Sequence, residues 1–336
     1  MMGRQYILFI VSIVLVIILV LSSNLNRVSS FALVNSTLDL ESTTTKPPNQ
    51  VVGLVFYGRK RQFSILFRYL QRNLKVNGGV LDKIIFAVRT DNITDLNYLE
   101  DIMKQNYSYY ERVILTNKNF DSFYSFLKDD DLIFKIDDDI VFIANGTFEK
   151  MLKEYEQNNG FILSANVVNH PLLSLAHTRI KAILPFREKE DGKWSLIDKA
   201  IEIDKTMVYG IKYQVGTCWW SNGRCAAIAH ESFLHHVAND NLDVYDFKRW
   251  DFHSEAYGRW SINFILFRGK IINKMPRTGD DEEMISNHLS SMHRRHGYAL
   301  GSAVVCHFSY NFQKEYLYTT NILDRYDELS KSYFGN

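Results

Sequence analysis

The sequence predicts an α/β protein, with a mainly parallel sheet flanked by helices and a single transmembrane helix in front of it. Two observations lead to this prediction. Residues 51–168 alternate short β-branched runs with helical apolar stripes, which is typical of a parallel sheet. Residues 6–22 form an apolar segment that is just long enough to span a bilayer. A hydrophobic content of 46% and an aromatic content of 14% indicate a folded domain with a substantial core.

The N-terminal segment predicts a membrane anchor. Tyr6–Leu21 is apolar apart from one serine and follows Arg4, so its short N-terminal end is expected to stay cytoplasmic. A cleaved signal peptide is the alternative, and we favour the anchor because no small-x-small cleavage pattern follows. A stretch rich in Ser, Thr and Asn comes next and predicts a flexible stem. The predicted divisions are a cytoplasmic tail at 1–5, an anchor at 6–22, a stem at 23–50 and a lumenal folded domain at 51–336.

Each element of the first half has its own signal. Val51–Tyr57 is a β-branched run, and the apolar positions from Phe63 to Leu74 share one helix face until Asn-Gly-Gly at 77–79 stops the helix. The next predicted elements are a strand at 83–88, a helix through 96–103, a strand at 112–115, a helix at 120–127, a strand at 131–136, an extended segment at 141–143, a helix capped by Thr147 and ended at Gly160, and a strand at 161–168.

The second half is less regular. Residues 211–223 predict a strand followed by a loop, and residues 261–267 predict either a strand or a buried helix. A strand at 303–308 carries His307, and residues 321–333 predict a closing amphipathic helix.

The segment KIDDDIVFI, at 135–143, contains the strongest chemical signal. Side chains alternate along a strand, so Asp137 and Asp139 are expected on one face and Asp138 on the other. Two carboxylates at a strand end predict a hard-oxygen site for Mg²⁺ or Mn²⁺ with positions open for substrate phosphates. The alternative is an inert, solvated acidic loop. Ligands of α/β sheets bind beyond the carboxyl ends of the strands, where this segment lies.

The chain resembles the Golgi GT-A glycosyltransferases in its anchor, stem, α/β half and aspartate triplet. KIDDDIVFI is similar to the Lys-x-Asp-Asp-Asp-Val-Phe-Val segment of the β-galactosyltransferase-like enzymes. The later segments RWSINFILF, GDDEEM and CHFSYNFQ look like those of a little-characterised group of glycosyltransferase-like proteins. The resemblance implies a GT-A-like fold with a donor-binding half at 51–170 and an acceptor-binding half at 171–336.

The resemblance also implies a metal site that uses the DxD motif. Asp139 would bind the cation directly, and Asp137 would contact the donor or reach the metal through water. Asp138 would assist donor binding or be structural. Some GT-A enzymes add a histidine from a late strand, and His307 is the matching candidate; the alternative for His307 is a hydrogen-bonded core residue. The cation, Mn²⁺ or Mg²⁺, would bridge the diphosphate of the donor and neutralise the leaving group.

The acidic cluster at 279–283 is the candidate for acid–base chemistry. An inverting transferase needs a general base, and Asp281 or Glu282 would fill that role, with a following helix expected to lower their pKa values. An acidic helix cap is the alternative, and in a retaining enzyme the cluster would bind acceptor hydroxyls instead. The predicted acceptor-binding residues are Glu283, Trp219 and Trp220, although tryptophans are more often part of a core.

Residues that follow the first two strands lie where a GT-A fold places donor contacts. Arg59 follows the first strand and Tyr57, at its end, could stack on the nucleobase. Arg89 and Asp91 follow the second strand and could contact nucleobase or ribose. Surface charge is an equally good explanation for each of the charged residues.

The composition excludes some functions and leaves others open. With 39 basic and 38 acidic residues there is no electrostatic case for a nucleic-acid partner. Three cysteines allow at most one disulfide, for which Cys218–Cys225 closes the shortest loop, and buried free thiols are the alternative. Sequons at Asn35, Asn92, Asn106 and Asn145 favour a lumenal domain.

We therefore expect a type II membrane glycosyltransferase of the Golgi or endoplasmic reticulum. It would use Mn²⁺ and a nucleotide sugar, expected to be UDP-linked, to modify a lumenal glycan or glycoprotein. One alternative is a catalytically inactive GT-A-like protein that binds glycans or acts as a scaffold. Another is a metal-dependent phosphoryl-transfer or hydrolytic enzyme, although the sequence has no P-loop and no Gly-x-Ser-x-Gly motif.

Overall fold

The computed structural model describes residues 50–105, 108–114, 120–196, 221–253, 259–273 and 279–332. No helix within these residues is long and apolar enough to cross a membrane. The predicted tail and anchor lie outside them, as do the predicted stem except for Gln50 and residues 211–220 of the predicted strand and loop.

The first half of the main sheet is parallel, as the sequence predicts. Its strands run in the order β3-β2-β1-β4, and each pairs in parallel with its neighbour. The β-branched, apolar composition of β1 fits a strand that is buried on both faces. The four strands are β1 (Val51–Tyr57), β2 (Lys83–Val88), β3 (Tyr110–Ile114) and β4 (Leu132–Asp137).

Beyond β4 the sheet becomes mixed. Strand β10 is antiparallel to both β4 and β6, which makes β6 and its parallel partner β11 run in the direction of β4. Strands β5 and β9 pair antiparallel with β11. These strands are β5 (Ile140–Ile143), β6 (Ile162–Val168), β9 (Arg249–Asp251), β10 (Phe264–Arg268) and β11 (Tyr298–His307). A separate hairpin pairs β7 (Phe186–Glu188) with β8 (Trp194–Leu196).

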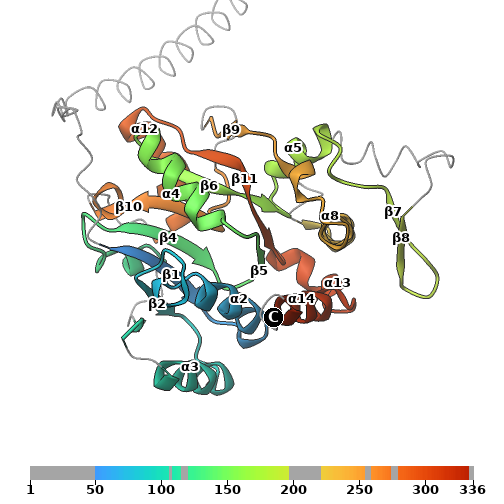
Figure 1. Cartoon of the computed structure of the whole chain (residues 1–336), viewed down its shortest axis with the longest axis horizontal. Helices are drawn as coiled ribbons and strands as arrows, with labels where there is room; N and C mark the ends of the chain where they lie inside the picture. The colour runs from blue at the N-terminus through green and yellow to red at the C-terminus, as the bar shows by residue number, and fades with distance from the viewer. Residues whose placement is uncertain are drawn as a thin grey trace, which may run out of the picture. The chain divides into compact units, whose positions relative to one another are not determined.

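Helices cover the sheet. Helix α4 packs on β6, β10 and β11, and α2 packs on β5 and on the closing helix α14 (Figure 1). The longer helices are α2 (Lys60–Arg72), α3 (Ile93–Gln105), α4 (Thr147–Gln157), α8 (Gly223–Ala238) and α14 (Ile322–Ser332). The shorter ones are α5 (Leu173–Arg179), α10 (Gly269–Asn273), α11 (Asp281–Glu283), α12 (Leu289–His293) and α13 (Lys314–Leu317). Between α11 and α12 the helix continues as a π-helical turn, Met284–His288.

Three local predictions need correction or refinement. The helix predicted at 120–127 is only a 3₁₀ turn, Phe120–Tyr124, because Ser125 bonds the Ser122 carbonyl through both its amide and its hydroxyl. Thr147 does not cap α4: the cap position is Gly146, in the left-handed region, and the Thr147 hydroxyl instead donates to the Val304 carbonyl (3.3 Å). The segment at 261–267, left open by the sequence, forms the strand β10 and its approach.

Candidate metal centre and its cleft

Four strand ends meet at one edge of the sheet. Strands β2, β1 and β4 are parallel neighbours, so the residues that follow them emerge together. Strand β11 runs in the direction of β4 and also ends at this edge, beside the start of β5. The topology therefore brings His307 next to an aspartate segment that is distant in sequence.

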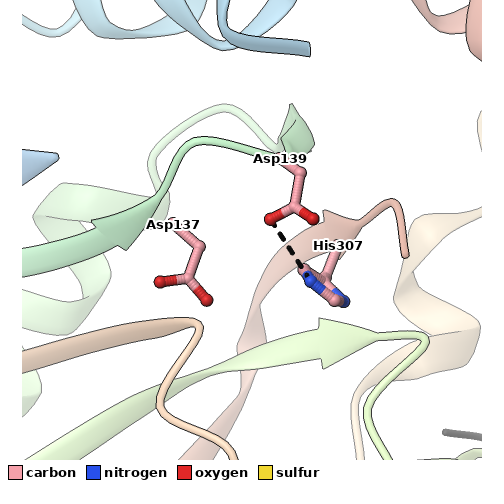
Figure 2. Close-up of side chains that lie close together, drawn as sticks. All are labelled: Asp137, Asp139 and His307. Atoms are coloured by element: carbon pink, nitrogen blue, oxygen red, sulfur yellow. Dashed lines mark ion pairs between the residues drawn. The ribbon is translucent and has the colours of Figure 1, made fainter. Parts of the chain in front are cut away.

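The aspartate segment is a turn rather than a continuous strand. Asp137 is the last residue of β4, and the turn formed by Asp138 and Asp139 carries the chain to β5. The prediction that Asp137 and Asp139 share one face of a strand is therefore wrong, because Asp139 is not part of the strand. The two carboxylates nevertheless lie close together, because Asp137 at the end of β4 and Asp139 in the turn both lie beside the end of β11 (Figure 2).

Asp137, Asp139 and His307 form a group that can hold a metal ion. Each offers one ligand atom, and these atoms all lie within 4.8 Å of one another. Asp139 Oδ1 is buried and lies 3.3 Å from His307 Nε2 without making a hydrogen bond among the described residues. A buried carboxylate oxygen without a donor costs free energy, which a cation at this point would remove. The residues present therefore fit a divalent metal ion.

Arg59 binds the other side of the aspartate turn. Its Nε donates to Asp138 Oδ1 and its Nη1 donates to Asp139 Oδ2, each at 2.8 Å. Asp138 Oδ2 accepts the Gly58 amide (2.8 Å), and burial raises the pKa of Asp138 to about 6 although Arg59 opposes this. Burial also acts to raise the pKa of Asp139, but Arg59 and His307 outweigh it and hold that pKa well below its usual range.

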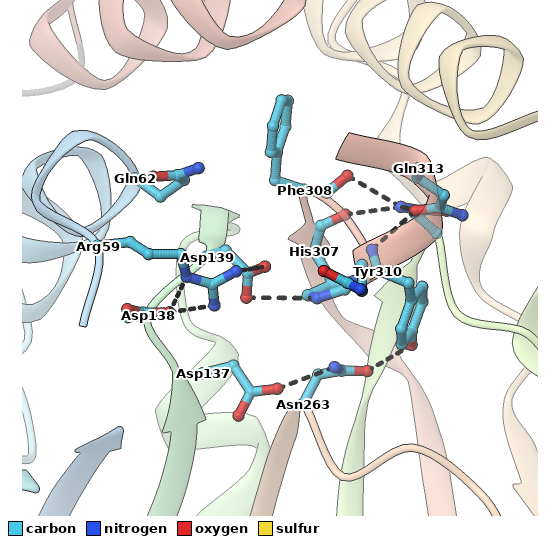
Figure 3. A network of polar contacts seen from close by, with 12 residues as sticks. Arg59, Gln62, Asp137, Asp138, Asp139, Asn263, His307, Phe308, Tyr310 and Gln313 are labelled. Atoms are coloured by element: carbon cyan, nitrogen blue, oxygen red, sulfur yellow. Dashed lines mark hydrogen bonds and ion pairs between the residues drawn. The ribbon is translucent and has the colours of Figure 1, made fainter. Parts of the chain in front are cut away.

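Asp137 is held by a second set of contacts. The fully buried Lys135 ammonium pairs with Asp137 and donates to the Ile262 carbonyl (3.0 Å). Asn263 Nδ2 donates to Asp137 Oδ2 (2.9 Å), and the Tyr310 hydroxyl donates to Asn263 Oδ1 (2.8 Å), as Figure 3 shows. Burial lowers the pKa of Lys135, but the neighbouring carboxylates, Asp137 first, outweigh it and raise that pKa overall.

A cleft of about 590 Å³ lies over this edge of the sheet. Most of its lining residues are charged, and both signs are present, which suits a ligand that carries phosphate and hydroxyl groups. The charged residues that line it are Arg59, Arg89, Lys135, Arg259, Lys314, Asp137, Asp138, Asp280, Asp281 and Glu282.

The second acidic cluster lies in this cleft, and its parts have different environments. Asp280 is the helix cap, with its Oδ1 accepting the Glu283 amide (3.1 Å). Asp281 accepts the Tyr124 hydroxyl (2.9 Å), whereas Glu282 accepts Arg259 Nε (2.5 Å). Burial raises the pKa of both Asp281 and Glu282. The expectation that a helix N-terminus lowers these values is therefore wrong, because burial is the larger effect.

Other predicted site residues are placed less favourably. Tyr57 contributes to the cleft lining, but its side chain is fully buried and its ring packs edge to face on Phe63, which leaves no open face for a nucleobase. Arg89 is exposed and lines the cleft, whereas Asp91 is exposed and is not part of the lining. Glu283 also does not line the cleft, and it accepts a hydrogen bond from Asn287 (2.7 Å). Trp219 and Trp220 lie outside the described residues.

Sequence reasoning missed several side chains of the site. Lys135 had a signal, because it lies two residues before Asp137 on the same strand and so on the same face. Asn263, Arg259 and Tyr310 had none. The pairing of β10 with β4 brings the first two toward the aspartates, and the pairing of β11 with β5 and β6 brings Tyr310 there.

The cysteines fit the prediction of at most one disulfide with one thiol left over. Cys225 is disulfide-bonded and Cys306 is a buried free thiol, while Cys218 lies outside the described residues.

The fold and the site together define an α/β protein with a candidate divalent-metal centre beside a cleft lined mostly by charged residues. No family model matches the sequence, and no curated protein matches it either. Among solved structures, the chain is similar to the crystal structure of 4-diphosphocytidyl-2C-methyl-D-erythritol synthase from Anaerococcus prevotii DSM 20548, with 11% identity and a TM-score of 0.38. That match covers 81% of this chain and 96% of the other. A similarity at this level carries no functional argument, so function is argued from the site.

Proposed function

We propose that this protein is a metal-dependent glycosyltransferase that moves a sugar from a nucleotide sugar, expected to be UDP-linked, to a lumenal glycan or glycoprotein. The convergence of Asp137, Asp139 and His307 beside a cleft that Asp137 lines carries the proposal. The glycosyltransferase-like KIDDDIVFI segment gives the cluster its chemical interpretation. A histidine nitrogen beside two carboxylates favours Mn²⁺ over Mg²⁺, which prefers oxygen ligands.

The cleft residues would bind the donor diphosphate from several sides. A bound Mn²⁺ would supply Lewis-acid neutralisation of the leaving nucleoside diphosphate. Arg89 and Lys314 add positive charge to the cleft lining. Lys314 also interacts electrostatically with Asp139 and Asp138. Cations arranged in advance stabilise developing charge without reorganisation during the reaction.

Asp281 is the proposed general base. Glu282 is already paired with the permanently charged Arg259, which opposes the rise that burial gives to the pKa of Glu282. Asp281 instead accepts a hydrogen bond from the neutral Tyr124 hydroxyl, and burial raises its pKa toward the range that suits proton transfer. Asp281 and Glu282 both line the cleft, so an acceptor hydroxyl bound in the cleft would lie near Asp281.

Donor turnover tests the proposal directly. The full-length protein, purified in detergent, is incubated with UDP- and GDP-sugars in the presence of Mn²⁺ or EDTA, and release of nucleoside diphosphate is measured. We expect saturable release that EDTA abolishes and that Asp139→Asn reduces at least 100-fold. Asp324→Asn, a change on the exposed surface, is the matched control. A folded protein that neither binds nor turns over any donor would favour the non-catalytic glycan-binding alternative.

We also propose that residues 6–22 anchor the chain in the Golgi or endoplasmic reticulum membrane with the folded domain in the lumen. Asn92 is exposed in the described structure, so its sequon is accessible to glycosylation. Asn145 is also exposed, but Thr147 of its sequon is buried and donates to the Val304 carbonyl. Expression of the full chain in a eukaryotic host should give a glycosidase-sensitive protein in the membrane fraction, and Asn92→Gln with Asn145→Gln should reduce the mobility shift. A soluble, unglycosylated product would contradict this placement.

A further inference from the structure

The two oxygens of Asp139 have different surroundings. Oδ2 accepts a hydrogen bond from Arg59 Nη1 at 2.8 Å. Oδ1 points the other way, lies 3.3 Å from His307 Nε2 and has no hydrogen-bond donor among the described residues. The Asp139 side chain is only 2% exposed, so bulk water does not solvate Oδ1. One oxygen is therefore neutralised by the protein, and the other faces the remaining candidate ligands.

Arg59 is itself held firmly. Its Nε donates to Asp138 Oδ1, and Asp138 Oδ2 accepts the Gly58 amide at 2.8 Å. A guanidinium is a planar, rigid fork, so one that bonds two carboxylates fixes their orientation relative to each other. Figure 3 shows the fork between Asp138 and Asp139, on the side of the turn away from His307. Asp138 thus serves as the anchor of Arg59, and each of its oxygens already accepts a hydrogen bond.

We propose that Arg59 is a positioning residue of the metal centre, which occupies Asp139 Oδ2 and so reserves Oδ1 for a divalent cation shared with Asp137 and His307. This inference rests on the metal site of the proposed function. Because the guanidinium and the cation use different oxygens, Arg59 stays in place when the cation binds. If Arg59 merely took the place of the metal and were displaced by it, its guanidinium would bond Oδ1, the oxygen that faces His307.

The second carboxylate of the centre is held differently, because both of its oxygens accept hydrogen bonds and a cation would use a remaining lone pair. Asp137 accepts Lys135 on Oδ1 and Asn263 on Oδ2 (2.9 Å). Each ligating aspartate therefore has a cationic side chain of the protein as a partner, Arg59 for Asp139 and Lys135 for Asp137. Such partners orient ligands, and their loss typically weakens metal binding tenfold to hundredfold.

Mn²⁺ binding in the absence of any donor tests the proposal. The full-length protein in detergent is titrated with Mn²⁺ by calorimetry, with the free ion followed by electron paramagnetic resonance. We expect Arg59→Met to weaken Mn²⁺ binding at least tenfold and Arg59→Lys, which keeps the charge but loses the fork, to fall in between. Arg61→Met is the matched control, because Arg61 is more than half exposed and pairs with Asp324 on the surface.

If Arg59→Met does not fold, a second variant provides the test. Arg59→Met combined with Asp138→Asn removes the buried charge that Arg59 neutralises, and it should also bind Mn²⁺ at least tenfold more weakly than wild type. Unchanged or tighter binding in this folded double variant overturns the proposal and makes Arg59 a competitor of the metal. A wild-type protein that binds no Mn²⁺ overturns both the metal centre and this role of Arg59. A wild-type protein that binds Mn²⁺ but turns over no donor overturns the proposed function alone.

Discussion

His177 should make the stability of this protein depend on pH. It lies on α5, is fully buried, and its Nε2 lies 2.6 Å from Asn166 Oδ1. The Asn166 amide nitrogen donates to the carbonyls of Tyr245 and Gly301, each at 2.8 Å, so Asn166 Oδ1 must accept. His177 Nε2 is therefore the protonated nitrogen, and Nδ1 is left without a hydrogen bond among the described residues. Protonation of Nδ1 would therefore place a positively charged imidazolium in the core without a hydrogen-bond acceptor for its second proton.

The size of the effect follows from the pKa. Burial, with a smaller contribution from His170, lowers the pKa of His177 from 6.5 to about 3. The unfolded chain therefore binds more protons than the folded chain below pH 6.5, and stability falls as the pH drops through this range. At pH 5 the expected loss from His177 alone is about 2 kcal/mol relative to neutral pH.

Urea denaturation of wild type and of His177→Gln, at pH 7 and at pH 5, measures this loss. Glutamine keeps an N–H donor but does not titrate, so any packing cost appears at both pH values and cancels. Wild type should lose about 2 kcal/mol more than His177→Gln between the two pH values. His253→Gln, a change at an exposed ring, gives the baseline for a histidine substitution. Equal losses in wild type and in His177→Gln would refute the reasoning.

Three further predictions concern the site. Asn263→Ala should weaken Mn²⁺ binding about tenfold in calorimetry, because Asp137 loses an orienting donor; unchanged binding would remove Asn263 from the centre. Asp281→Asn should slow sugar transfer at least 100-fold with donor binding retained, whereas Glu282→Gln should slow it less than 10-fold, and the reverse order would make Glu282 the base. Asp137→Leu should destabilise the fold by about 3 kcal/mol in urea titrations, because it leaves the Lys135 ammonium buried without its partner. Adding Lys135→Met should recover most of that loss, and no recovery would show that the pair is not coupled.

The sequence predicted the parallel half of the sheet well, because its strands carry local signals. Val51–Tyr57 and Lys83–Val88 are β-branched apolar runs separated by amphipathic helices, and the structure confirms both strands with these bounds. The mixed half was harder to predict, since the antiparallel insertion of β10 between β4 and β6 leaves no mark in its own composition.

The ligands of the candidate metal centre could be predicted from the sequence, but the side chains that hydrogen-bond to those ligands could not. Three adjacent aspartates are a strong signal by themselves, and the resemblance directed attention to His307. The hold of Arg59 on the aspartate turn and the contact of Asn263 with Asp137 depend on pairings between distant parts of the chain. Tyr57 shows the opposite error, because its place at a strand end was predicted correctly while its ring points into the core.

The arrival of β11 beside the aspartate turn also has a consequence for folding. Arg59 follows the first described strand and His307 ends the last one, so the site forms only after nearly the whole described chain has assembled. Such long-range pairings form late because loop closure opposes them. If the proposed cation binds there, it stabilises only fully assembled molecules, by an amount that grows with its concentration. Mn²⁺ affinity would then distinguish correctly folded preparations from compact but incomplete ones.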